Sequence, residues 1–376
     1  MSKKKITICF FWPAYAGNGT SVDDLVVGFN RDLYNIIFVY LLNKGPSDNH
    51  LENAGFKVFC LCKAPRLRIF NPLIVLHLAG ILKNNNVDIL HCHRHKMTVY
   101  GTLAAVIAKT PVVCTHVHGL NRTRSWHRKL VNAVIYRRVH TVFGVAQAVC
   151  QDIIANNRID PDKVMVLENS IDYNRFAYTD ISHAQARDLL GIDRESFVFG
   201  TIGRLVPTKG LNCMLEAFAL VKTEIIKARL VIIGTGPLES KLRHQTRKLG
   251  IEESVYFTGY RNDITRCIHG LDCFVLSSIA EGMPRVIIEA MAAGVPCIST
   301  DVGGIPEVIN SPDVGVITRS RDSVSLADSM RKIAGLPKQK REVLIDNARC
   351  RIKKYYSHEV VREKLRLLYS RLLNEA

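Results

Sequence analysis

Short, continuously apolar runs alternate with segments of helical spacing along almost the whole chain. Residues 5–11 (KITICFF), 35–41 (NIIFVYL) and 111–117 (PVVCTHV) belong to a first series of such runs. After a polar stretch from 172 to 196 the alternation starts again with residues 196–203 (SFVFGTIG). Strands that alternate with helices form parallel sheets, and burial on both faces makes their strands apolar throughout. We therefore predict an α/β fold of two doubly wound, Rossmann-like parallel-sheet domains.

The length of 376 residues also favours two domains, because a single hydrophobic core usually stops growing at about 250–300 residues. We place the first domain at residues 1–180 and the second at residues 181–355. The last segment, 356–376, carries apolar residues at helical spacing and needs a surface on which to pack. Ligands of open α/β sheets bind outside the carboxyl ends of the strands, so two facing domains would form a cleft lined by strand-to-helix loops.

Several features of the sequence predict a cytoplasmic protein. Its apolar runs are far shorter than the roughly 20 residues that a membrane-spanning helix needs. The basic start MSKKK is followed by a short apolar run that lacks a signal-peptide cleavage site. The eleven cysteines include no CxxC pair and are odd in number, as expected of buried thiols in a reducing compartment.

The formal charge of +17 is concentrated in residues 57–138, where fourteen lysines and arginines stand against the single acid Asp88. Around Trp126 and Tyr136 these cations are mixed with aromatic residues, a composition typical of surfaces that rest on anionic lipid. We therefore predict peripheral association with the inner face of the cytoplasmic membrane. A solvated basic face without a partner is the alternative. Binding of nucleic acid is not expected, because no fold signature supports it.

The most informative stretch is residues 277–309, in which a glycine-containing loop leads into a helix. Pro284 suits the first turn of that helix, since its missing N–H would have no partner there and its φ is already helical. The backbone N–H groups from Gly282 and Met283 onward then form an anion site that the helix dipole reinforces. A diphosphate is the natural occupant of such a site.

Two acidic residues accompany this loop. Glu289 lies among apolar residues inside the helix, where a carboxylate needs hydrogen-bond donors, and a ribose diol supplies two. Glu281, just ahead of the helix, would meet the transferred group. In the alternative interpretation, Glu289 points to solvent and Glu281 only favours the positive helix terminus.

A second loop, within residues 199–210 (FGTIGRLVPTKG), follows the first strand of the second domain and carries Arg204 and Lys209. Two fixed cations beside a helix start can neutralise a diphosphate leaving group without magnesium. The spacing is neither a GxGxxG fingerprint nor a GxxxxGK[ST] P-loop. Taken alone, the pair would be read as two surface cations.

The stretch EGMPRVIIEAMAAGVPCISTDVGG resembles the Glu-x7-Glu region of retaining glycosyltransferases of family 4, which have the GT-B fold. Segments similar to that family follow in the expected order over nearly the whole chain, including AGNGTS, THVHG, VLENSIDYNRF, IGRLVPTKG and VIIGTGPLESKL. The resemblance implies two facing Rossmann-like domains, with the C-terminal helix returning to the first of them. It also implies a nucleotide diphosphate sugar as the donor and no cofactor.

The resemblance assigns roles to individual residues. Arg204 and Lys209 would bind the donor diphosphate, Glu289 the ribose, and Glu281 the donor sugar. Among these, Glu281, Arg204 and Lys209 are candidate catalytic residues, together with His118 near the reacting anomeric carbon. The remaining donor-binding candidates are Gly17, Gly19, Gly234, Phe257, Gly259, Tyr260, Arg261, Gly282, Met283, Pro284 and Arg285. Ser170 departs from the family, which commonly has glycine at this position.

Five histidines, His91, His93, His95, His116 and His118, raise the question of a metal, because an H-x-H pair on a strand points two rings to one side. No carboxylate or cysteine completes a convincing ligand set. We therefore expect no metal and interpret only His118 as a site residue. The sequence Asp160-Pro161-Asp162 is interpreted as a turn rather than as a metal-binding motif.

The two cations predict a metal-independent transfer, and the resemblance implies that a hexosyl or N-acetylhexosaminyl group is transferred with retention. The donor is expected to be UDP-linked, and the acceptor a lipid-linked, lipopolysaccharide or polysaccharide glycan. Nucleotide-sugar epimerases and other enzymes with two Rossmann-like domains are the first alternative, because fold alone does not assign function. A basic nucleic-acid-binding protein is the alternative from another class.

Overall fold

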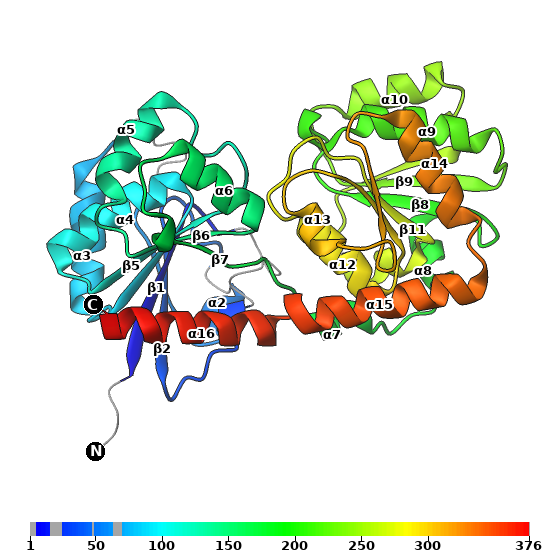
Figure 1. Cartoon of the computed structure of the whole chain (residues 1–376). Helices are drawn as coiled ribbons and strands as arrows, with labels where there is room; N and C mark the ends of the chain where they lie inside the picture. The colour runs from blue at the N-terminus through cyan, green and yellow to red at the C-terminus, as the bar shows by residue number, and fades with distance from the viewer. Residues whose placement is uncertain (1–4, 16–24, 47–48, 63–69, 376) are drawn as a thin grey trace. The chain divides into compact units, whose positions relative to one another are not determined.

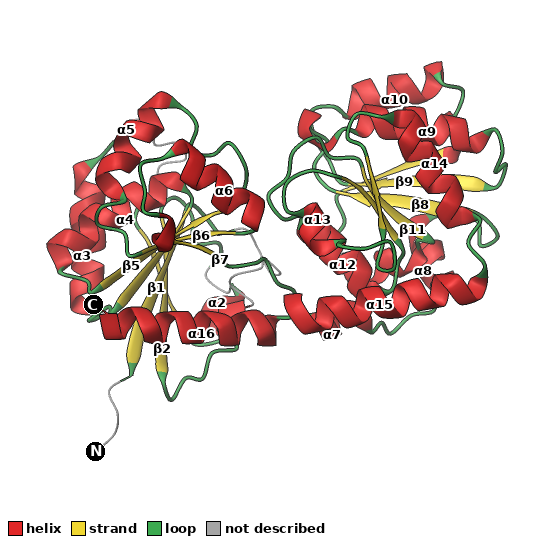
Figure 2. Ribbon diagram, in the orientation of Figure 1, coloured by secondary structure: helices red, strands yellow, loops and turns green. Residues whose placement is uncertain are grey.

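The computed structural model describes residues 5–15, 25–46, 49–62 and 70–375, and the chain forms two compact units. Unit 1 comprises Met1–Ser170 and His358–Ala376, and unit 2 comprises Ile171–Ser357 (Figure 1). Each unit is built on a parallel sheet with helices packed around it (Figure 2). The predicted pair of doubly wound, parallel-sheet domains is confirmed.

The sheet of unit 1 has the strand order β3-β2-β1-β4-β5-β6-β7. The order changes direction between β1 and β4, as in other doubly wound sheets. The strands are β1 (Ile6–Trp12), β2 (Tyr34–Tyr40), β3 (Lys57–Cys60), β4 (Ile89–His93), β5 (Val112–Val117), β6 (Thr141–Gly144) and β7 (Val164–Val166). The helices are α2 (His50–Asn53), α3 (Pro72–Asn84), α4 (His95–Ala108), α5 (Trp126–Ile135), α6 (Gln147–Asn156), the 3-10 helix η1 (Pro161–Lys163) and α16 (His358–Glu375).

Helix α16 packs in the core of unit 1, although all of unit 2 precedes it in the sequence. Val361, Leu365 and Tyr369 recur every four residues and are buried in that core, which gives the predicted apolar stripe its surface. The chain leaves unit 1 and returns to it at neighbouring points, since Ser170 Oγ lies 2.9 Å from His358 Nδ1.

The sheet of unit 2 has the strand order β10-β9-β8-β11-β12-β13, with the change of direction between β8 and β11. The strands are β8 (Phe197–Ile202), β9 (Ala228–Ile233), β10 (Val255–Gly259), β11 (Cys273–Leu276), β12 (Cys297–Thr300) and β13 (Val316–Thr318). The helices are α7 (Tyr173–Ala177), α8 (His183–Leu190), α9 (Leu211–Lys222), α10 (Glu239–Lys248), α11 (Ile264–Cys267), α12 (Arg285–Ala293), α13 (Ile305–Val308), α14 (Ser323–Ala334) and α15 (Lys338–Tyr356). Short 3-10 helices are η2 (Pro207–Lys209), η3 (Glu252–Ser254) and η4 (Ile268–Gly270).

Unit 2 begins at Ile171, earlier than the predicted start of the second domain at residue 181. The physical reason is α7, which packs against α12 and α15 of unit 2. Within the polar stretch that suggested a linker, Phe176 is buried and supplies the apolar anchor for this packing.

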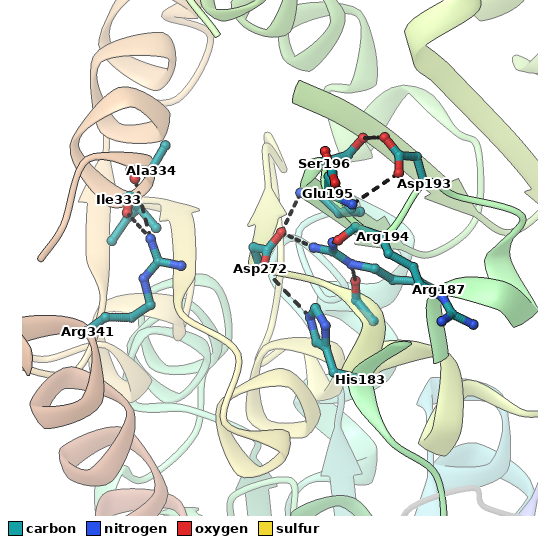
Figure 3. A network of polar contacts seen from close by, with 12 residues as sticks. His183, Arg187, Asp193, Arg194, Glu195, Ser196, Asp272, Ile333, Ala334 and Arg341 are labelled. Carbon is teal, nitrogen blue, oxygen red and sulfur yellow. Dashed lines mark hydrogen bonds and ion pairs between the residues drawn. The ribbon is translucent and has the colours of Figure 1, made fainter. Parts of the chain in front are cut away.

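A buried arginine organises the amino-terminal side of the unit 2 sheet. Arg187 of α8 pairs with Asp272, which directly precedes β11 (Figure 3). The same carboxylate accepts a hydrogen bond from the backbone N–H of Val198 at 2.6 Å, and Arg187 also donates to the carbonyl oxygens of Gly270 and Arg194. A buried charge with this many partners is tolerated. The loops that carry the predicted site lie at the opposite side of the sheet, where the strands end.

The helices and the cysteines bear on the expected location and chemistry. In the described part of the chain, no helix combines the length and the apolar character needed to cross a bilayer. All eleven cysteines are free thiols, and Cys9, Cys114, Cys150, Cys273 and Cys297 are buried as expected.

Candidate functional site

Two predicted loops meet where the strand order of unit 2 changes direction. β8 and β11 are neighbours, while β9 continues the sheet beyond β8 and β12 continues it beyond β11. Ligands of open α/β sheets bind at the carboxyl ends of the two strands at such a point. The loop after β8 carries Arg204 and Lys209, and the loop after β11 carries Glu281.

Hydrogen bonds hold the two loops together. The backbone N–H of Ile279 donates to the carbonyl oxygen of Thr208 at 2.7 Å, and the Ser277 hydroxyl donates to the carbonyl oxygen of Lys209 at 2.9 Å. Gly210 has a φ of +60°, and a Cβ atom there would lie 2.1 Å from the Ser277 carbonyl oxygen. Only glycine permits this approach, so the backbone around Lys209 is fixed against the second loop.

Lys209 and Glu281 form an ion pair across the two loops. Lys209 Nζ lies 2.6 Å from Glu281 Oε1, and the Ser278 hydroxyl donates to the same oxygen at 2.6 Å. Both side chains are largely buried, with 21% of Lys209 and 14% of Glu281 exposed. The structure therefore brings together two residues that the sequence analysis placed in separate motifs.

Arg204 has a different environment. Arg204 is exposed, and no hydrogen bond or ion pair of its guanidinium is found among the described residues. The guanidinium has five N–H donors in a fork that matches phosphate oxygens. The loop after β8 thus offers one cation held by a carboxylate and one cation available to an anion.

The loop after β11 delivers the chain to the amino terminus of α12. Gly282, Met283 and Pro284 are buried there, and Pro284 directly precedes the first residue of the helix. The loop before α13 packs against them, since the backbone N–H of Gly304 donates to the carbonyl oxygen of Gly282 at 2.6 Å. The first N–H groups of a helix have no acceptor within the helix, and such a terminus favours an anion.

Glu289 is buried within α12, with 8% of the residue exposed, so it does not point into bulk solvent. Its Oε1 lies 3.6 Å from Arg285 Nη2. Burial raises the pKa of the Glu289 carboxyl above its ordinary value, and the charges of Arg285 and Arg175 oppose that shift only in part. A carboxylate in this position gains from additional hydrogen-bond donors.

Three glycines join neighbouring strand ends on the β10 side of the sheet. The N–H of Gly234 donates to the carbonyl oxygen of Gly259 at 2.7 Å, and a Cβ atom on Gly234 would lie 2.0 Å from the carbonyl oxygen of Gly203. Phe257 stacks beneath the guanidinium of Arg243, whose Cζ is 4.4 Å from the ring centroid. These residues form a compact wall beside the two loops.

Two of the predicted donor-binding residues, Tyr260 and Arg261, lie in contrasting positions. Tyr260 is 78% exposed. Arg261 is held in a forked ion pair with Asp263, with N···O distances of 2.8 and 2.5 Å, and it also donates to the carbonyl oxygen of Leu189. The Arg261 guanidinium therefore has local partners, whereas the Tyr260 ring is accessible to a ligand.

The other predicted site residues belong to unit 1. His118 follows β5 and is half-buried, and its Nε2 lies 3.1 Å from His93 Nδ1. Burial lowers the pKa of His118 well below its ordinary value, with further lowering by nearby His116 and Arg94. The ring is therefore neutral at pH 7. Gly17 and Gly19 lie outside the described residues.

Arg94 of unit 1 is a candidate functional residue that the sequence analysis did not consider. It follows β4 with a φ of +72°, which is uncommon for a residue with a side chain, and its N–H donates to the carbonyl oxygen of His116. Such backbone strain is concentrated at functional sites. No sequence signal identified Arg94, because a positive φ at a non-glycine residue is set by the surrounding fold.

Models of known protein families match both units of the chain. A model of group 1 glycosyl transferases matches residues 183–351, and a model of glycosyltransferase family 4 matches residues 15–175. The chain is a family 4 glycosyltransferase. The two models leave only short segments of the enzyme unmatched, so the family membership that the motifs suggested is confirmed for both units.

The glycosyltransferase is 29% identical over 301 residues to the Escherichia coli UDP-Gal:alpha-D-GlcNAc-diphosphoundecaprenol alpha-1,3-galactosyltransferase, with 77% of each chain covered. It is also 29% identical over 264 residues to the Bacillus anthracis N-acetyl-alpha-D-glucosaminyl L-malate synthase, with 67% of this chain and 66% of that protein covered. Anabaena HepE in complex with UDP has a TM-score of 0.83 at 22% identity, with 97% of this chain and all of that chain (100%) covered. This likeness confirms the GT-B fold.

Proposed function

We propose that this glycosyltransferase uses a UDP-linked sugar and binds its diphosphate at the β8/β11 loops of unit 2. Lys209, Arg204 and the amino terminus of α12 supply the positive charge and N–H donors that a diphosphate needs. Glu289 accepts hydrogen bonds from the ribose hydroxyls, which satisfies its buried carboxylate. UDP is favoured because the name of the E. coli relative specifies UDP-Gal and HepE was crystallised with UDP.

The ion pair between Lys209 and Glu281 is the observation that best supports this proposal. In the transfer, negative charge develops on the departing diphosphate, and fixed cations stabilise it. The Lys209 ammonium has three donors and can serve Glu281 and a phosphate oxygen together. Glu281 then accepts a hydrogen bond from a hydroxyl of the donor sugar. Because two cations are built into the loops, transfer proceeds without a divalent cation at the diphosphate.

The transferred group is a hexosyl or N-acetylhexosaminyl unit, and transfer proceeds with retention of anomeric configuration. Retention is proposed from the resemblance to retaining enzymes of family 4. Both classes of sugar occur in the names of the relatives, which specify a galactosyl and an N-acetylglucosaminyl group. His118 would lie near the anomeric carbon, and a neutral imidazole there can accept or donate a hydrogen bond.

The acceptor is a lipid-linked or polysaccharide glycan, reached from the inner face of the cytoplasmic membrane. Trp126, Leu130 and Val134 recur every four residues along α5, and each is more than 60% exposed. Cations flank this apolar stripe, including Arg122 and Lys129. A helix with an apolar stripe bordered by cations binds anionic lipid surfaces. The E. coli relative, by its name, acts on an undecaprenol diphosphate substrate.

The donor proposal is tested by thermal unfolding of the full chain with a panel of nucleotide sugars. UDP-sugars should raise the unfolding midpoint, because a ligand that binds only the native state stabilises it. The Lys209→Met variant should lose this shift, while Lys241→Met, which removes an exposed lysine of α10, should retain it. A chain that no nucleotide sugar stabilises would refute the proposal.

The membrane proposal is tested by sedimentation with vesicles containing phosphatidylglycerol at low salt. Replacing Trp126, Leu130 and Val134 with alanine should reduce the bound fraction, whereas Ile226→Ala should not. Ile226 is a matched control because it is 78% exposed and belongs to unit 2. Equal sedimentation of both variants would show that the α5 stripe does not bind membranes.

A further inference from the structure

Three histidines gather on one face of the unit 1 sheet. β4 and β5 are paired so that His93 lies opposite His116, and His91 is two residues before His93 on the same side of its strand. All three side chains are buried, at 1%, 0% and 3% exposure for His91, His93 and His116. One ring nitrogen from each residue lies within 4.8 Å of the corresponding atoms of the other two.

Each ring has one nitrogen with a partner and one without. His91 Nδ1 lies 2.5 Å from the Tyr369 hydroxyl, His93 Nδ1 lies 3.1 Å from His118 Nε2, and His116 Nε2 lies 3.2 Å from the carbonyl oxygen of Leu167. Among the described residues, no hydrogen-bond partner is found for His91 Nε2, His93 Nε2 or His116 Nδ1, although these atoms are buried.

The position of the proton on His116 follows from its partner. A carbonyl oxygen only accepts, so His116 Nε2 must carry the hydrogen that it donates to Leu167. In a neutral ring, Nδ1 then has a bare lone pair. A buried lone pair without a donor costs free energy, and a metal ion is one of the few groups that can remove that cost.

A small cavity adjoins the three rings. Its volume is about 10 Å³, on the order of one water molecule, and Leu25, Leu167 and Leu365 form part of its wall. Glu168 also lines it, but Lys364 Nζ holds that carboxylate at 2.7 and 2.9 Å. The space suits an ion with at most one additional small ligand.

We propose that His91 Nε2, His93 Nε2 and His116 Nδ1 bind a zinc ion within unit 1. Neutral imidazole is a preferred zinc ligand, and zinc–nitrogen bonds of about 2.0–2.1 Å require the three nitrogens to move toward a common centre. The second nitrogen of a zinc-bound histidine normally donates to a nearby acceptor, as the pairing described above allows. A water molecule completes the four ligands.

The site has a positioning role as well as a structural one. Zinc on His93 Nε2 leaves the ring proton on Nδ1, which then donates to His118 Nε2. That bond fixes His118 in the tautomer that carries its proton on Nδ1. The three ligands all belong to unit 1, whereas the proposed donor loops belong to unit 2, so the inference does not depend on the proposed donor chemistry.

Zinc content and ligand type test the inference on the full chain, stripped with a chelator and reloaded with Zn²⁺. We expect one zinc per chain and an X-ray absorption spectrum with a nitrogen shell at about 2.0–2.1 Å. The His116→Gln variant should bind zinc at least about 100-fold more weakly, more than the loss of an outer partner causes. Replacement of the exposed His77 by Gln is the matched control and should change nothing.

A second variant covers the case in which His116→Gln does not fold. Tyr369→Phe keeps the aromatic ring and removes only the hydroxyl beside His91 Nδ1. Loss of such a partner should weaken zinc binding about 10–100-fold. A wild-type chain without stoichiometric zinc, a sulfur shell from the cysteines, or unchanged zinc affinity in folded His116→Gln or in Tyr369→Phe would each overturn the inference.

Discussion

Replacing Lys209 with methionine tests the stabilising role of its ion pair separately from its proposed role in catalysis. Methionine keeps an unbranched apolar stem and removes the ammonium that lies 2.6 Å from Glu281. The Glu281 carboxylate then retains the hydroxyl of Ser278 as a partner but loses its cation. Arg204→Met removes the second cation of the same loop, and the folded chain gives that guanidinium no partner among the described residues.

The environment of the pair sets the expected magnitude. Removing one partner of a fully buried ion pair costs about 3–5 kcal/mol. Because 21% of Lys209 and 14% of Glu281 remain exposed, we expect about 1–3 kcal/mol for Lys209→Met. Arg204→Met should change the free energy of unfolding by no more than about 0.5 kcal/mol. Both variants should lower turnover on the order of 100-fold, since each removes a group proposed to stabilise the departing diphosphate.

The two tryptophans allow the two units to be monitored separately. Trp12 and Trp126 both belong to unit 1, so tryptophan fluorescence follows that unit while far-UV circular dichroism follows both. In urea titrations, Lys209→Met should shift only the unfolding transition of unit 2. Circular dichroism detects this transition, whereas tryptophan fluorescence does not. Adding Glu281→Gln should restore stability without restoring turnover. A Lys209→Met chain as stable as the wild type, or a double variant with recovered turnover, would refute the reasoning.

Two further predictions follow from the unit 2 site. The raised pKa of Glu289 means that the folded chain binds this proton more tightly than the unfolded chain, so its contribution to stability is lost as pH rises above about 4.5. Glu289→Gln should remove this loss of stability with rising pH, so the variant should be more stable than the wild type at pH 7 in urea titrations. The same variant should bind UDP more weakly, as measured by calorimetry. We propose that two protein cations neutralise the diphosphate, so turnover should not depend on added Mg²⁺; a strict requirement for Mg²⁺ would contradict that role.

The sequence allowed the strands and their arrangement to be predicted because apolar runs buried on both faces have few alternative structures. The domain boundary was misplaced because the local polarity around Phe176 concealed a single apolar anchor. In unit 2, a carboxylate among apolar residues predicted the burial of Glu289, which the structure shows, and loop composition predicted an anion site, which stays a prediction. Both are local properties.

The pairing of Lys209 with Glu281 could not be predicted, because it depends on β8 and β11 being neighbours, and their order in the sheet is a property of the whole fold. The histidines show the same limit. The H-x-H spacing placed His91 and His93 on one side of a strand, but the third ring, from His116, comes from another strand whose register had to be known. The sequence analysis named all five histidines and found no carboxylate or cysteine to complete a ligand set, but it could not show that these three rings meet.

The position of α16 has a consequence for synthesis of the chain. Unit 2 is one uninterrupted stretch and can fold once the ribosome has released it, whereas unit 1 needs residues 358–375 to cover its apolar face. Tyr369, the partner of His91, arrives with that last helix. A nascent chain stalled just before this segment would therefore expose hydrophobic surface in its earliest-made half and become a substrate for chaperones.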